Sequence, residues 1–170
     1  MYKKYNWLPD FVYGSTDGII TTFAVVSAVE GGGLAPKIIL IMGFANLLAD
    51  GFSMATSKYL SDKAELDQDL EIASAINPLL GGAYTFLAFI VLGSVPLLAY
   101  VLQPILNLEL DFTFSLTIGL TLAALFFVGF LKGHFVAKSK LMAGLTTMSM
   151  GAVAALISYN VGFYIESLFA

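Results

Sequence analysis

Two aspartates lie inside long apolar stretches of the sequence. Asp17 belongs to the stretch 11–29 and Asp50 to the stretch 38–57. Each stretch approaches the ~20 apolar residues that a helix needs to cross a bilayer. A carboxylate at mid-membrane depth costs roughly 2.5–3.5 kcal/mol on insertion scales, so it usually faces a bundle interior or a water-filled path. We therefore interpret both aspartates as candidate ion- or proton-binding groups.

Asp50 belongs to a row of side chains spaced by four residues, which places them on one helix face. The row contains Asn46, Asp50 and Met54, and it ends at Lys58. Carboxylate, amide oxygen and thioether together suit a transition metal such as Fe²⁺ or Mn²⁺, with Zn²⁺ and Co²⁺ possible, whereas Mg²⁺ and Ca²⁺ prefer all-oxygen shells. Lys58 lies about 12 Å from Asp50 along the helix axis, too far for a direct ion pair.

One chain offers few metal ligands, and a symmetric site at a dimer axis would complete the shell more easily. Met54 taken alone is weak support, because most methionines in apolar helices fill space. Asp17 lies between Gly14 and Gly18, and a GxxxG spacing lets two helices approach closely. The alternative interpretation of Asp17 is therefore a hydrogen-bonded group in a packing seam.

The composition indicates an integral membrane protein. Of the 170 residues, 58% are hydrophobic and only 12% are charged, whereas soluble domains have about 25% charged residues. The absence of cysteine excludes disulfides, thiolate metal sites and a cysteine nucleophile. A net charge of −4 argues against a nucleic-acid partner. No nucleophile–base arrangement or glycine-rich phosphate loop appears, so an enzyme is not expected.

Apolar segments predict an all-α membrane protein with five transmembrane helices in a single domain, residues 1–170. The expected spans are 11–29, 38–57, 79–102, 112–131 and 141–165. Pro96 is expected to kink the third helix and Pro104 to end it. In the five-helix arrangement seven of the eight lysines fall on one side, namely Lys3, Lys4, Lys58, Lys63, Lys132, Lys138 and Lys140.

The lysine asymmetry predicts a cytoplasmic N-terminus and a C-terminus that is outside or lumenal. The receiving compartment stays open, since a plasma membrane and a vacuole would give the same pattern. After Ser57 the sequence has good helix formers and no breaker before Asn77-Pro78. We therefore expect the second helix to extend into the cytosol.

Three acidic side chains of this extension share a face by their spacing: Asp62, Glu65 and Asp69. They are a candidate metal-collecting site at the cytosolic entrance. The alternative is an ordinary solvated helix face. His134, the single histidine, is expected at a helix end among lysines, in an exposed or capping role rather than as a metal ligand.

Two motifs resemble the vacuolar iron transporter family. Gly14-Ser15-Thr16-Asp17-Gly18 with the following 19–23 resembles the start of that family's first helix, and 43–54 resembles its second. Asn77-Pro78, 95–98, Lys132-Gly133 and Gly151-Ala152 agree more loosely. The resemblance implies a homodimer of five-helix subunits that exports Fe²⁺, often with Mn²⁺, in exchange for protons along a path between the subunits. It assigns Asp17 and Met54 to metal binding.

The sequence departs from the family pattern in two respects. Asn46 stands where the family often has glutamate, and a carboxylate occurs one turn later, at Asp50. The chain also resembles a short member that lacks the large cytoplasmic metal-binding domain between the second and third helices. The resulting hypothesis is a transporter of divalent metal ions with Asp17, Asn46, Asp50 and Met54 as the site. Its alternatives are a passive divalent-cation channel and a non-transporting membrane scaffold or sensor.

Overall fold

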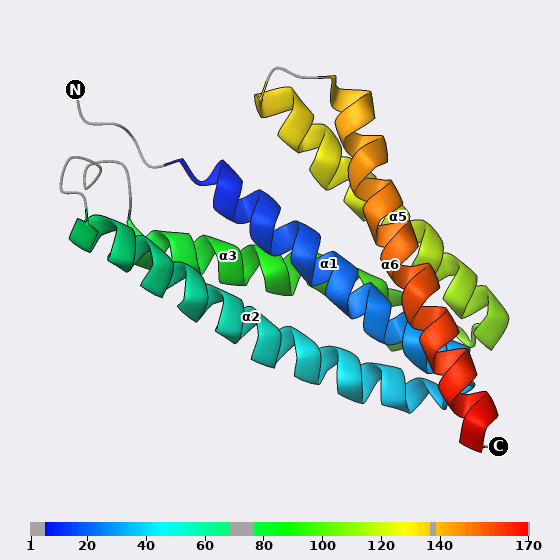
Figure 1. The fold of residues 1–170 in the computed structure, drawn as a ribbon. Helices are drawn as coiled ribbons and strands as arrows, with labels where there is room; N and C mark the ends of the chain where they lie inside the picture. Colours follow the sequence, from blue (N-terminus) through cyan, green and yellow to red (C-terminus); the bar gives the residue numbers. More distant parts are fainter. Residues whose placement is uncertain (1–5, 69–76, 137–138, 170) are drawn as a thin grey trace.

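The computed structural model describes residues 6–68, 77–136 and 139–169 of the chain. These residues are all-helical and contain five helices that are long and apolar enough to cross a membrane, which confirms the predicted fold class. The elements, drawn in Figure 1, are α1 (Leu8–Gly31), α2 (Pro36–Gln68), α3 (Pro78–Gly93), the 3₁₀ turn η2 (Val95–Leu97), α4 (Leu98–Leu106), α5 (Leu110–Phe135) and α6 (Lys140–Phe169).

The third span is broken in the middle by Pro96. α3 ends at Gly93, η2 carries the proline, and α4 completes the crossing. Proline lacks the N–H that an interior helical turn needs, so the predicted kink is confirmed and has this physical cause. Pro104 does not end the helix as predicted: it lies inside α4, which ends where Asn107 adopts a left-handed conformation at φ 49°. A left-handed residue is a common way to close a helix.

α1 is the central helix of the bundle and packs against α2, α3, α5 and α6. Its contact with α3 depends on the predicted glycine pair. A Cβ on Gly18 would lie 2.6 Å from the carbonyl oxygen of Phe89, and one on Gly14 would collide with the backbone of Thr85. The helices can approach this closely only because both positions lack a side chain. The close-packing function expected of Gly14 and Gly18 is thus confirmed.

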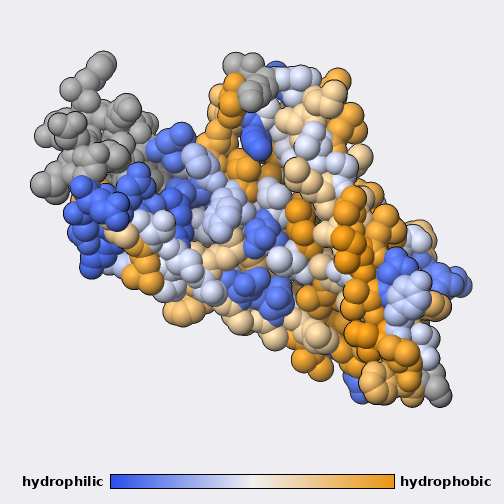
Figure 2. Space-filling model, viewed as in Figure 1, coloured by the Kyte–Doolittle hydropathy of each residue, from blue (hydrophilic) through white to orange (hydrophobic). Residues whose placement is uncertain are grey.

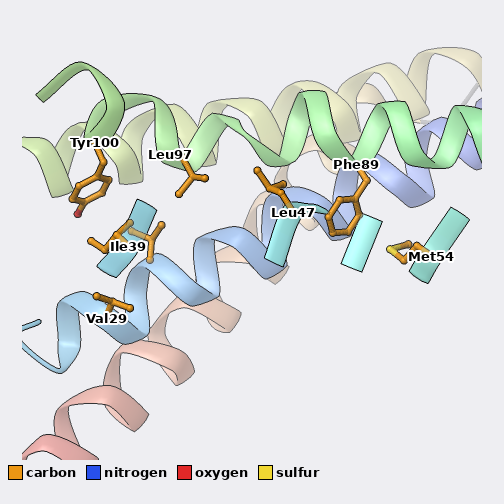
Figure 3. Close-up of a cluster of buried hydrophobic side chains, with 8 residues drawn as sticks. Val29, Ile39, Leu47, Met54, Phe89, Leu97 and Tyr100 are labelled. Carbon is orange, nitrogen blue, oxygen red and sulfur yellow. The ribbon is translucent and has the colours of Figure 1, made fainter. Parts of the chain in front are cut away.

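The buried apolar side chains form a main cluster shared by α1, α2 and the broken third span (Figure 3). Its members are Val26, Val29, Ile39, Leu47, Met54, Phe89, Leu97 and Tyr100. A smaller cluster joins α1 to α5 through Ile19, Leu125 and Val128. The outward faces of α2 and α6 carry many exposed large apolar side chains. Such faces suit contact with lipid or with another helix in a bilayer.

α2 is longer than its predicted span and continues without interruption from Ser57 to Gln68. This part of α2 and the junction of α5 with α6 carry Lys58, Lys63, Lys132 and Lys140, and we refer to that end of the bundle as the lysine-rich end. Asp69 and Lys138 lie outside the described residues. His134 is exposed near the end of α5, as expected, where its ring contacts Phe135 edge-on.

Candidate metal site at the α1–α2 seam

Asp17 and Asp50, which come from different helices, are brought close together. Asp17 lies on α1 and Asp50 on α2, both side chains are half-buried, and the two carboxylates are close enough to repel each other. We call this contact, with Asn46 and Met54, the α1–α2 seam. Two carboxylates in a medium of low dielectric constant repel strongly unless a cation or a proton neutralises one of them.

Asn46 and Met54 flank Asp50, one helical turn to either side. The Asn46 amide nitrogen is buried and has no hydrogen-bond partner. Turning this amide over would present its oxygen in the same place. Met54 is 9% exposed and packs in the main apolar cluster with Leu47 and Phe89 (Figure 3). Its thioether is therefore packed in the apolar cluster, one helical turn from Asp50 on α2.

The antiparallel register of the seam is defined by a second contact nearer the lysine-rich end. There the Lys58 ammonium lies 3.1 Å from a carboxylate oxygen of Asp10. Moving seven residues along α1, from Asp10 to Asp17, corresponds to moving eight residues back along α2, from Lys58 to Asp50. Both steps are about 10–12 Å at 1.5 Å per residue. Along the axis of α2, Met54 consequently lies between the ion pair and the level of the two aspartates.

Lys58 also forms an ion pair with Asp62 on its own helix, at 2.6 Å. Asp10 and Asp62 are only 4% and 5% exposed. Lys58 therefore does not pair with Asp50, as expected. Asp62 differs from the prediction that it shares a solvent-facing collecting site: it is buried against Lys58, whereas Glu65 is exposed. The i, i+4 spacing to Lys58 decides its partner.

The Asp10–Lys58–Asp62 cluster was not predicted from the sequence. Asp10 looked like a residue before the first span, yet α1 begins at Leu8 and buries this side chain in its first turn. The only signal was the i, i+4 pair on α2. A second missed contact is at the opposite end of the bundle, where the Tyr100 hydroxyl donates a hydrogen bond to Glu30. It ties the last turn of α1 to α4.

The seam is accessible from one side of the subunit. Ser53 and Ser57 of α2 are exposed there. Figure 2 shows polar surface in the middle of this face, over α1 and the neighbouring side of α2, whereas the surface over α6 is mostly apolar. Polar surface at this depth is unusual for a helix that faces lipid. It fits a surface that contacts water or another protein subunit.

A single subunit contributes few ionisable ligands to the seam. Within residues 6–68, 77–136 and 139–169, no group of three or more histidine, cysteine, aspartate or glutamate side chains is placed to hold a metal ion. The seam offers two carboxylates, one amide and one thioether. The Thr21 hydroxyl, on the same face as Asp17, donates instead to the Asp17 backbone carbonyl at 2.9 Å.

Comparison with known families places this geometry in context. The model of the VIT family matches residues 8–72 and 65–163, which together cover most of the chain. The chain belongs to the VIT family. The predicted resemblance to vacuolar iron transporters is therefore confirmed. The two matched segments overlap at 65–72, within and just beyond the end of α2.

Several curated VIT-family proteins are similar to this chain at modest identity. A vacuolar iron transporter of Plasmodium berghei is 24% identical over 225 residues, covering 94% of this chain and 82% of the relative. Vacuolar iron transporter 2 of Oryza sativa is 22% identical, covering 94% and 87%. A vacuolar iron transporter homolog of Arabidopsis thaliana is 31% identical over 108 residues, covering 57% and 54%.

Proposed function

We propose that this chain is one subunit of a homodimeric transporter that moves Fe²⁺ or Mn²⁺ out of the cytosol in exchange for protons. The observation that carries the proposal is the proximity of Asp17 and Asp50, which lie on two helices that are long and apolar enough to span a membrane. Membership of the VIT family, whose relatives include proteins named vacuolar iron transporters, supports metal ions as the cargo.

The coupling mechanism follows from the repulsion between the two carboxylates. Either one divalent cation or protons can relieve that repulsion, so the two kinds of ion compete for the same oxygens. A deprotonated pair binds the metal on the cytosolic side, and protonation from the acidic side releases it. Met54 adds a soft thioether ligand, and Asn46 adds an amide oxygen. This set favours Fe²⁺ and Mn²⁺, with Zn²⁺ and Co²⁺ as further cargo, over Mg²⁺ and Ca²⁺.

A second copy of the chain would complete the ligand shell. Among the residues that the structure describes, the seam has few ligands by itself, and Asp17 and Asp50 are each only half-buried. A two-fold axis beside α1 and α2 would bring two sets of the same ligands together. The apolar residues Phe44, Leu48 and Phe52, exposed on α2, supply further surface for contact with the partner copy or with lipid.

The lysine distribution supports a cytosolic lysine-rich end, with the N-terminus on the same side and the C-terminus outside or lumenal. The protein would then function in a plasma or vacuolar membrane. Glu65, with Asp69 beyond the described residues, would attract cations weakly at the entrance. The family model matches the chain in two segments, 8–72 and 65–163, that meet near the end of α2. This division supports a short cytosolic connection in place of the large metal-binding domain.

Purified protein in proteoliposomes provides the test, with a metal-sensitive fluorophore and a pH dye inside. Fe²⁺, Mn²⁺, Zn²⁺, Co²⁺ and Mg²⁺ are supplied outside, with and without an acidic interior. We expect Fe²⁺ and Mn²⁺ to enter faster when the interior is acidic, and the interior to become more alkaline as they do. Protein-free vesicles are the control.

Two other outcomes would contradict the proposal. Metal entry at the same rate without a pH gradient, and without proton movement, would indicate a passive cation channel. No entry of any metal, combined with greater stability after Asp50 and Met54 are both replaced by leucine, would indicate a scaffold or sensor.

A further inference from the structure

Lys58 is a cation held at the lysine-rich end of the α1–α2 seam. Its ammonium contacts Asp10 on α1 at 3.1 Å and Asp62 on α2 at 2.6 Å. Both carboxylates are nearly fully buried, whereas the lysine side chain retains 26% exposure. The anionic partners are therefore fixed in the bundle, and the flexible lysine side chain is the component that can move into solvent.

The position of this ammonium matters because of the seam's register. Lys58 follows Asp50 and Met54 in the row of residues spaced by four, two turns or about 12 Å beyond Asp50. Because Lys58 contacts Asp10 of α1, its ammonium lies at the same interface between α1 and α2 as Asp17. A divalent cation that enters the seam from the lysine-rich end therefore meets a tethered positive charge before it reaches Asp17 and Asp50.

We infer that Lys58 controls the access of divalent cations to the seam from the lysine-rich end. In its tethered position the ammonium repels an entering metal ion and occupies the carboxylates of Asp10 and Asp62. An entering ion must displace it toward solvent. The apparent affinity for metal supplied from this side then depends on the charge at position 58 as well as on the ligands of the seam. The inference rests on the proposed transport function.

A purely structural alternative makes a different prediction. If Lys58 only joins α1 to α2, its loss lowers the stability of the subunit and leaves the KM for metal unchanged. Removing the ammonium that contacts two buried carboxylates is itself destabilising. A test must therefore compare two charge states at position 58 in the same variant after it has folded.

The absence of cysteine from the chain makes such a test possible. In Lys58→Cys the new thiol is the only one, and it can be modified after the protein has folded in vesicles. Methyl methanethiosulfonate adds a neutral group, whereas 2-aminoethyl methanethiosulfonate restores an ammonium on a side chain of lysine-like length. Lys63→Cys, at an exposed position on the same helix, receives the same two reagents as the matched control.

We expect the neutral form of Lys58→Cys to show a KM for Mn²⁺ roughly three- to tenfold below that of the ammonium form. The reason is that a positive charge about 12 Å from the seam repels the metal ion, and removing this repulsion lowers the KM by a factor of this size. The ammonium form should resemble the unsubstituted protein and Lys58→Arg. The Lys63→Cys forms should differ little from each other. Equal KM values for the two Lys58→Cys forms, or a higher KM in the neutral form, would overturn the inference.

The same measurement separates this inference from the proposed function. If the unsubstituted protein transports Mn²⁺ and only the KM difference at position 58 is missing, Lys58 has a structural role and the transport function stands. If the unsubstituted protein moves no metal, the proposed function fails. A difference in thermal stability between the two modified forms without a difference in KM would also assign Lys58 to structure alone.

Discussion

Asp17 of α1 and Asp50 of α2 are both half-buried at the α1–α2 seam and lie close enough for their carboxylates to repel. Both helices are of membrane-spanning length. The two carboxylates repel each other unless a divalent cation or a proton neutralises one of them, and this is the physical basis of the exchange that we propose.

Asp50 should contribute directly to metal binding. Asp50→Asn keeps the shape of the side chain and removes its charge, so the KM for Mn²⁺ should rise by on the order of tenfold. Uptake into proteoliposomes over a range of Mn²⁺ concentrations measures this change. Asp67→Asn, at an exposed position on the same helix, should leave the KM unaltered. An unchanged KM in Asp50→Asn would remove this residue from the site.

Met54 should affect which metals are transported. Met54→Leu preserves the volume of a side chain that is buried in the main cluster. The free energy of unfolding should therefore change by less than about 1.5 kcal/mol. Losing the thioether should slow Fe²⁺ and Mn²⁺ transport relative to Mg²⁺. Met42→Leu, at an exposed position on α2, is the matched control. Identical selectivity in both variants would assign Met54 to packing only.

Gly18 should be intolerant of even a methyl group. Its missing Cβ would lie 2.6 Å from the Phe89 carbonyl oxygen, so Gly18→Ala must push α1 away from α3. Overpacking of this type costs about 1–3 kcal/mol, and the displaced α1 carries Asp17 with it. Thermal unfolding in detergent should show a lower Tm. Gly119→Ala, where the added Cβ has open space, should keep the Tm, and equal values for both variants would contradict the α1–α3 packing.

The dimer should place two seams near each other. Ser53→Cys introduces a single thiol on the polar face beside the seam, because the chain has no cysteine of its own. Oxidation in membranes should produce a disulfide-linked dimer on a gel without reductant. Leu87→Cys, exposed on α3, should give little cross-linking. Cross-linking at position 87 and none at position 53 would place the dimer interface elsewhere.

Much of the fold could be predicted from local sequence signals. Five apolar segments gave five spanning helices, Pro96 gave the break in the third, and Gly14 and Gly18 gave a close helix contact. Pro104 was misjudged because a proline near a helix end removes few hydrogen bonds, and Asn107 closes the helix instead. The local signals thus predict elements better than the points at which they end.

The candidate site could be predicted only in part, for a physical reason. Asp50, Asn46 and Met54 lie on one helix, so their spacing predicts a common face. The proximity of Asp17 to Asp50, and the ion pair of Asp10 with Lys58, depend on the register between two helices, which no local spacing encodes. Asp62 was assigned to an exposed face because its burial depends on Lys58 and α1 together.

The most direct test of the account is metal–proton exchange by Asp17→Asn in proteoliposomes with an acidic interior. This variant removes one charge of the facing pair while keeping its shape. The account predicts that Mn²⁺ uptake and the accompanying alkalinisation are both abolished, while the protein remains folded and dimeric by size-exclusion chromatography. Unchanged, proton-coupled Mn²⁺ uptake by a folded Asp17→Asn protein would contradict it.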